Sequence, residues 1–120
     1  MRLLRGCALV ALAIVAGCRE SPAAAPAPTG VLEIAQVDFR LRPQAIRTRS
    51  GRVTVEVVNR GRLAHTLRLR RGSMEWAAVS SLLPGARARA TRRLRPGTYT
   101  MFCVIANHEE LGMWGTVEVR

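Results

Sequence analysis

The chain has 120 residues, of which 19 are basic and 8 acidic, so its formal net charge is +11. Every basic residue is arginine, which excludes chemistry that needs a lysine, such as a Schiff base or the phosphate-binding lysine of a P-loop. The length suits one domain, and the apolar share of 48% is that of a folded chain rather than a disordered one.

The start of the chain has the pattern of an export signal. Two arginines precede an uncharged run over residues 7–17, which is typical of a secretory signal peptide and shorter than the roughly 20 residues that span a bilayer. The run closes with Val-Ala-Gly-Cys at positions 15–18, which resembles the lipobox of bacterial lipoproteins. The resemblance implies removal of residues 1–17 and acylation of Cys18. An ordinary signal peptide, cleaved after a small residue, is the alternative.

A lipid on Cys18 would anchor the exported chain to the outer face of the cytoplasmic membrane or to the outer membrane, with its domain in the periplasm or extracytoplasmic space. Residues 18–30 contain three prolines and no large apolar side chain, so they predict a flexible linker. The folded domain is then expected over residues 31–120. It retains a single free thiol, Cys103, which is a liability in an oxidising compartment unless something binds it.

Apolar residues in the domain recur at every second position, which is the period of half-buried strands. Turn signals such as Asn59-Arg60-Gly61 and Pro96-Gly97 separate these runs. A change of phase after Ile34 predicts a β-bulge near residues 35–36. Only residues 73–83 are compatible with a short helix, inside an irregular crossover. The pattern predicts an all-β fold, a β-sandwich with Greek-key connections.

Four residues with soft or borderline donor atoms occupy positions that suit one metal site: His65, Cys103, His108 and Met113. The cysteine ends a predicted strand, and the second histidine and the methionine follow it at intervals of five residues. Two histidines and a cysteine in a plane, with a distant methionine, form the blue copper arrangement. Zinc also binds cysteine and histidine, but a thioether is a poor zinc ligand, so copper is favoured.

The segment from Pro96 to Cys103, together with Asn107-His108, Gly112-Met113 and the final strand, closely resembles the cupredoxins, the small blue copper proteins. The Cys-x4-His-x4-Met spacing is nearer to rusticyanin, sulfocyanin and auracyanin than to plastocyanin. The resemblance covers residues 31–120. It implies one type I copper with His65, Cys103 and His108 as equatorial ligands and Met113 as the axial ligand. Thr66 stands where many members have an asparagine that braces the ligand loop.

Together with the lipobox, the resemblance to cupredoxins implies a membrane-tethered carrier of single electrons, not an enzyme. Both histidines of the chain belong to this one site, so the additional coppers of nitrite reductases or multicopper oxidases have no histidine ligands. The alternative function is copper handling, as a periplasmic chaperone or buffer. Such sites tend to be open and rich in methionine or histidine, and the chain has no such cluster.

The expected partners are redox proteins such as cytochromes or oxidases, reached through His108 and an apolar patch of Ile105, Ala106 and Leu111. The resemblance also implies a partly exposed aromatic ring at Phe102. Nucleic acid is not an expected partner of an exported chain, and we expect a monomer. Four arginines share one face of a predicted strand: Arg87, Arg89, Arg93 and Arg95. They form either a solvated edge that prevents aggregation or a platform for an acidic partner or anionic lipid.

Overall fold

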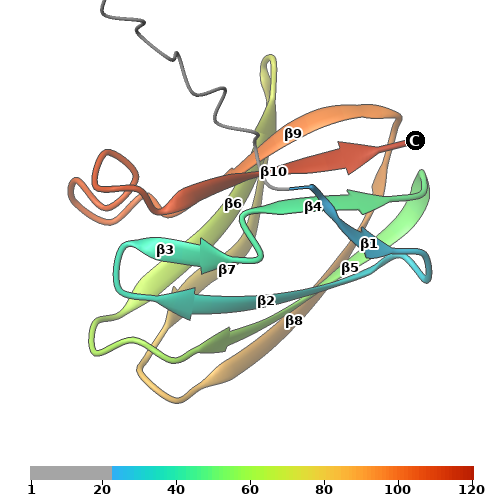
Figure 1. Cartoon of the computed structure of the whole chain (residues 1–120). Helices are drawn as coiled ribbons and strands as arrows, with labels where there is room; N and C mark the ends of the chain where they lie inside the picture. Colours follow the sequence, from blue (N-terminus) through green and yellow to red (C-terminus); the bar gives the residue numbers. More distant parts are fainter. Residues whose placement is uncertain (1–22) are drawn as a thin grey trace, which may run out of the picture.

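The structure is a computed structural model that describes residues 23–120. Within this range the chain is all-β, and its strands form two sheets packed as a sandwich (Figure 1). The larger sheet has, in spatial order, β1 (Ala25–Ala27), β4 (Ala45–Thr48), β10 (Trp114–Val119), β9 (Gly97–Phe102), β6 (His65–Arg71) and β7 (Met74–Leu82). The smaller has β3 (Arg40–Arg42), β2 (Val31–Val37), β5 (Gly51–Asn59) and β8 (Arg87–Leu94). The β-sandwich predicted from the sequence is confirmed.

The expected signal peptide over residues 1–17 and the acylation site at Cys18 lie outside the described residues. Among the residues that are described, none belongs to a helix long and apolar enough to cross a bilayer.

The core lies between the sheets, and the two-residue period of the strands fills it. Val53, Val55 and Val57 point inward from β5, opposite Leu67 and Leu69 of β6. All five are at most 2% exposed. Burial of apolar surface stabilises a fold by about 25 cal/mol per Å². The apolar faces of the two sheets therefore supply a core that needs no metal ion.

The bulge expected near residues 35–36 is wrong, because β2 runs without interruption from Val31 to Val37. The inward positions continue from Ile34 to Gln36, whose amide is fully buried. The chain then reverses at Asp38 and Phe39, where Phe39 has a φ of +64°. A hairpin turn, not a bulge, changes the phase of the apolar pattern.

The short helix considered for residues 73–83 is also wrong, because Met74–Leu82 form β7 beside β6. His65 pairs with Leu82, whereas Leu67 pairs with Val79, so β7 carries one extra residue in this part of the ladder. The bulge puts the buried Val79 and Leu82 three positions apart. This spacing imitates a helical period in the sequence.

The larger sheet begins inside the segment that the sequence assigned to the linker. Ala25–Ala27 form β1, which pairs in parallel with β4. Ala27 is buried, and its carbonyl accepts a hydrogen bond from the Thr48 hydroxyl at 2.8 Å. Any linker that precedes the sheet is therefore shorter than residues 18–30.

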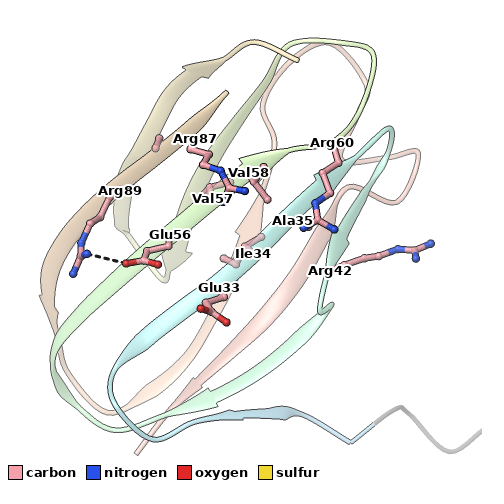
Figure 2. A pocket seen from close by; sticks show the side chains of 11 residues that line it. Glu33, Ile34, Ala35, Arg42, Glu56, Val57, Val58, Arg60, Arg87 and Arg89 are labelled. Carbon is pink, nitrogen blue, oxygen red and sulfur yellow. Dashed lines mark ion pairs between the residues drawn. The ribbon is translucent and has the colours of Figure 1, made fainter. Parts of the chain in front are cut away.

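The arginines predicted on one strand face are exposed, but they do not form one continuous patch. Arg87 and Arg89 line a cleft of about 550 Å³ on the outer face of the smaller sheet (Figure 2), where Arg89 pairs with Glu56 at 2.8 Å. Arg93 and Arg95 line a separate pocket at the other end of β8.

Candidate metal centre

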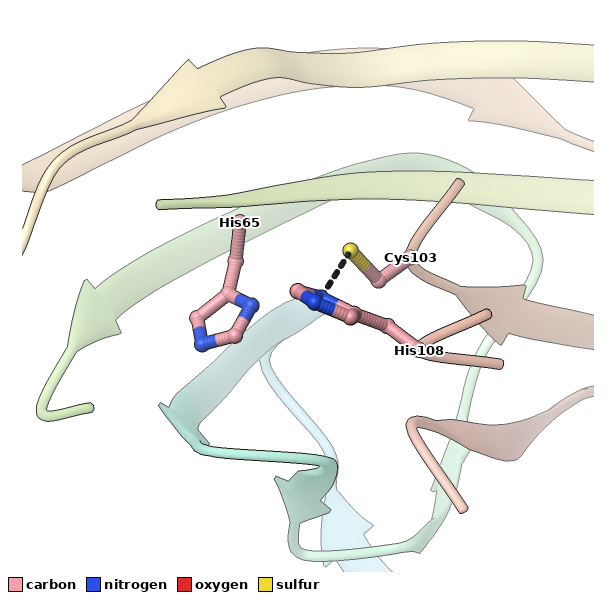
Figure 3. Close-up of side chains that lie close together, drawn as sticks. All are labelled: His65, Cys103 and His108. Carbon is pink, nitrogen blue, oxygen red and sulfur yellow. Dashed lines mark hydrogen bonds between the residues drawn. The ribbon is translucent and has the colours of Figure 1, made fainter. Parts of the chain in front are cut away.

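Three segments distant in sequence meet at one end of the sandwich, where the β2–β3 turn, the β5–β6 loop and the β9–β10 loop lie together (Figure 1). His65 begins β6, Cys103 directly follows β9, and His108 lies in the β9–β10 loop. One ligating atom from each side chain lies within 4.8 Å of the other two (Figure 3). The side chains are almost completely buried, with exposed fractions of 0%, 1% and 7% for the three residues.

The spacing of these atoms fits a metal ion bound between them. Nδ1 of His108 lies 3.7 Å from Sγ of Cys103. Two ligands about 2.1 Å from a shared trigonal metal are about 3.6 Å apart, so this separation matches a shared ion. Nδ1 of His65 is buried without a hydrogen-bond partner among residues 23–120. Figure 3 shows a ring nitrogen of His65 turned toward the other two side chains. A buried nitrogen left unpaired is costly, and a bound metal would satisfy it.

Met113 is fully buried, and the backbone ties it to the other candidate ligands. Its carbonyl accepts a hydrogen bond from the N–H of Cys103 at 3.1 Å, and its N–H donates to the carbonyl of His108 at 2.9 Å. Gly112 precedes it with a φ of +116°, a conformation that side chains strongly disfavour. The bend at Gly112 thus returns the chain to Cys103, which is why the spacing of five residues closes a compact loop.

Asp38 holds the far side of the His65 ring, and sequence reasoning missed it. Its Oδ1 lies 3.0 Å from Nε2 of His65, while its carboxylate accepts the N–H groups of Arg62 and Leu63 at 2.9–3.3 Å. The hydrogen bond from the Arg62 backbone, supported by His65, lowers the pKa of Asp38 below its usual value. An ionised carboxylate at Nε2 favours the tautomer with its proton there, which leaves Nδ1 free to bind a metal.

Gly61 permits this arrangement, because a Cβ at that position would collide with the Asp38 carboxylate. Asn59 fixes the same loop from within. Its side-chain amide donates to the carbonyls of Leu63 and Leu82, both at 2.8 Å, and its oxygen accepts the N–H of Gly61. The Asn-Arg-Gly turn thus also builds the support of His65.

Thr66 contacts the Cys103 thiol directly. Its backbone N–H donates to Sγ at 3.4 Å, and its hydroxyl lies 3.6 Å from the same sulfur. The hydroxyl also accepts the N–H of Val104 at 2.9 Å, and the Gln36 amide donates to the Thr66 carbonyl at 2.9 Å. The short threonine side chain therefore braces the ligand loop at the position where many cupredoxins have an asparagine.

The surface around the site differs in part from the expectation. Phe102 is only 4% exposed, because the guanidinium of Arg70 covers its ring at 4.1 Å and is itself paired with Glu109. The expectation of a partly exposed ring is therefore wrong. Of the proposed apolar patch, Ala106 and Leu111 are exposed, whereas Ile105 packs against the core.

No protein-family model matches the chain, and no curated protein sequence matches it significantly. Among solved structures, reduced auracyanin from the photosynthetic bacterium Roseiflexus castenholzii superposes with a TM-score of 0.68 at 18% identity, covering 78% of this chain and 99% of that one. Auracyanin A, a "blue" copper protein from Chloroflexus aurantiacus, gives 0.64 at 16% identity over 80% of this chain and all of that one. A multicopper oxidase gives 0.57 at 18% identity, with 75% of this chain covering 41% of the oxidase. At these identities the likeness establishes the fold, the cupredoxin β-sandwich.

Proposed function

We propose that this chain is a blue copper protein that carries single electrons, with His65, Cys103, His108 and Met113 as the ligands of one copper ion. The observation that carries the proposal is the convergence of two imidazole nitrogens and a thiol within 4.8 Å in a buried cluster, with the backbone of Met113 hydrogen-bonded to Cys103 and His108. When bound, copper supplies the one-electron Cu(I)/Cu(II) couple. The donor set of two histidines, a cysteine and a methionine is the one that such a site uses.

The burial of the site favours electron transfer over catalysis. With four protein donors a copper ion has no open position for a substrate, and His108 is the most exposed of the four proposed ligands, with 7% of that residue exposed. An electron can leave through His108, but a molecule cannot enter. The chain has two histidines in total, and this site takes both, so a second catalytic copper would lack imidazole ligands.

The same burial weighs against the alternative of a copper chaperone or buffer. A chaperone transfers its ion by ligand exchange, for which a partner's ligands must reach the metal. Here His65, Cys103 and Met113 are at most 1% exposed. Exchange would require the β9–β10 loop to open, whereas electron transfer requires no such motion.

An acidic redox partner suits the cleft of Figure 2. Strand register places Arg42, Ala35, Val58 and Arg87 side by side across the smaller sheet, so an apolar centre lies between two arginines. Arg60, which begins the loop leading to His65, lines the same cleft. Positive charge here would attract carboxylates and accelerate docking at low ionic strength. The association rate should then fall as salt increases.

The proposed setting is outside the cytoplasm, with the monomeric chain tethered by an acylated Cys18. Mass spectrometry of the membrane fraction tests this directly, and an unacylated, soluble mature chain would contradict it.

The electron-carrier function itself is tested by loading the protein with Cu(II) and following its visible absorption through a redox titration. A reversible one-electron change of an intense visible band supports the function, and a colourless Cu(II) complex contradicts it.

A further inference from the structure

A second pocket lies at the opposite end of the sandwich from the candidate metal centre. It has a volume of about 320 Å³ and is lined by Arg71, Met74, Arg92, Arg93, Arg95 and Tyr99. Arg71 ends β6, the strand that His65 begins. At about 3.3 Å per residue the pocket is roughly 20 Å from the metal centre, so copper chemistry does not explain it.

The charge of this pocket is unusual. Four of its six lining residues are arginines and none is acidic. None of the four forms an ion pair within residues 23–120. The cleft of Figure 2 also has four arginines, but it includes Glu33 and Glu56, and Arg89 is already paired. Like charges repel one another, and no acidic side chain of the pocket offsets this repulsion, so the cluster favours a bound anion.

The pocket is also organised before any ligand arrives. The guanidinium carbon of Arg71 lies 5.7 Å from the centre of the Tyr99 ring, within the range of a cation–π contact. Gly97 makes room for it, because a Cβ there would lie 2.5 Å from Nε of Arg71. The Tyr99 hydroxyl donates to the carbonyl of Arg95 at 2.8 Å, which fixes the backbone at the pocket rim.

We propose that this arginine pocket binds a phosphate-type oxyanion, supplied either by the headgroup of an anionic phospholipid or by free phosphate. The guanidinium group presents several N–H donors in a fixed plane that matches phosphate oxygens, and several such groups bind one phosphate better than scattered surface charges do. The proposal does not depend on the copper function.

A phospholipid source has a structural consequence. Because β1 already begins at Ala25, an anchor at Cys18 would leave only about 25 Å of extended chain between the lipid and the sheet. The domain would then stay close to the headgroups. With a headgroup in the arginine pocket, the metal centre at the other end would face away from the membrane, toward soluble partners.

The test uses the full chain with Cys18→Ser, so that no acyl chain contributes to binding. Calorimetry with inorganic phosphate and flotation with phosphatidylglycerol vesicles, against phosphatidylcholine vesicles, separate the two sources. The double variant Arg93→Gln/Arg95→Gln removes two charges from the pocket. The matched control Arg42→Gln/Arg87→Gln removes the same charge from the other cleft. Circular dichroism melts verify that both variants fold.

We expect the pocket variant to lose at least tenfold in affinity for phosphate, for phosphatidylglycerol vesicles, or for both, and the control to lose less than twofold. Loss for vesicles alone assigns the pocket to the lipid headgroup, and loss for phosphate alone assigns it to the free ion. Equal losses in the two variants would show that only net charge matters and would overturn the proposal. Absence of binding to either probe by the parent protein would overturn it as well.

Discussion

Asp38 Oδ1 lies 3.0 Å from Nε2 of His65, and the same carboxylate accepts the backbone N–H of Arg62. One side chain thus orients the first candidate ligand and also fixes the loop that delivers it. The pair is formed by the β2–β3 turn and the start of β6, which belong to different sheets. The metal centre therefore depends on the docking of the two sheets as well as on the ligand loop.

Asp38→Asn should keep one acceptor oxygen for Nε2 of His65 and remove the negative charge of this contact. An uncharged partner holds the proton at Nε2 of His65 less firmly and so orients Nδ1 less well toward the metal, and we expect affinity for Cu(II) to fall by roughly 10- to 100-fold. Competition titration with a chelator measures it. Glu33→Gln is the matched control, since it removes one carboxylate from β2, the strand that leads to Asp38, without contact to His65. Equal affinities for Asp38→Asn and the control would show that Asp38 supports only the loop.

Met113→Leu tests the contribution of the axial sulfur separately from that of the other three ligands. Leucine preserves the buried apolar volume but has no sulfur, and Cu(II) loses more from a missing donor than Cu(I) does. We expect copper and colour to be retained while the reduction potential rises, as measured by a redox titration. Loss of copper binding in this variant would contradict the assignment of Met113 as a weak axial ligand.

Removal of copper should leave the fold intact, because most of the core lies between the sheets and only Cys103 and Met113 belong both to it and to the site. The far-ultraviolet circular dichroism of the apo and copper-loaded protein should nearly coincide. Leu69→Ala, at a fully buried core position, should lower the free energy of unfolding by roughly 2–5 kcal/mol in the apo protein. An unfolded apo protein would contradict this account of the core.

Glu118 should contribute stability that depends on pH. Hydrogen bonds from Arg120 and then from Arg47, its register partner on β4, lower the pKa of Glu118. A carboxylate with a lowered pKa stabilises the fold above its unfolded-state pKa, and this stability is lost as the pH falls through the folded-state value. Glu118→Gln should therefore be less stable than the parent at pH 7, with the difference shrinking below about pH 4. Urea unfolding at several pH values measures it, and a pH-independent difference would argue against ionisation as the cause.

Local sequence patterns predict much of this fold, and the strands that they do not predict correctly have definite physical causes. Val53, Val55 and Val57 of β5 follow the two-residue period because one face of that strand packs against the core. The strand β7 does not, since a bulge puts Val79 and Leu82 three positions apart. The prediction of a bulge in β2 is wrong because Gln36, a polar residue, takes an inward position.

The candidate ligands were visible in the sequence because three of them share one short loop with a regular spacing. The residues that orient these ligands were not visible in the sequence. Asp38 reaches His65 across 27 positions of sequence, and a single acid at the end of an apolar strand carries no signal of such a contact. The arginine pocket likewise joins the ends of β6 and β8 with the start of β7, and the sequence alone shows only a row of charges.

The visible spectrum of the Cu(II)-loaded protein, compared with that of Cys103→Ser, tests the central claim most directly. A thiolate bound to Cu(II) gives an intense charge-transfer band, and serine offers a hard, weakly acidic hydroxyl in its place. The account predicts a blue or green parent protein and a variant in which the colour and the fast electron transfer are both lost. A colourless Cu(II) complex of the parent, or a variant that keeps the band, would contradict it.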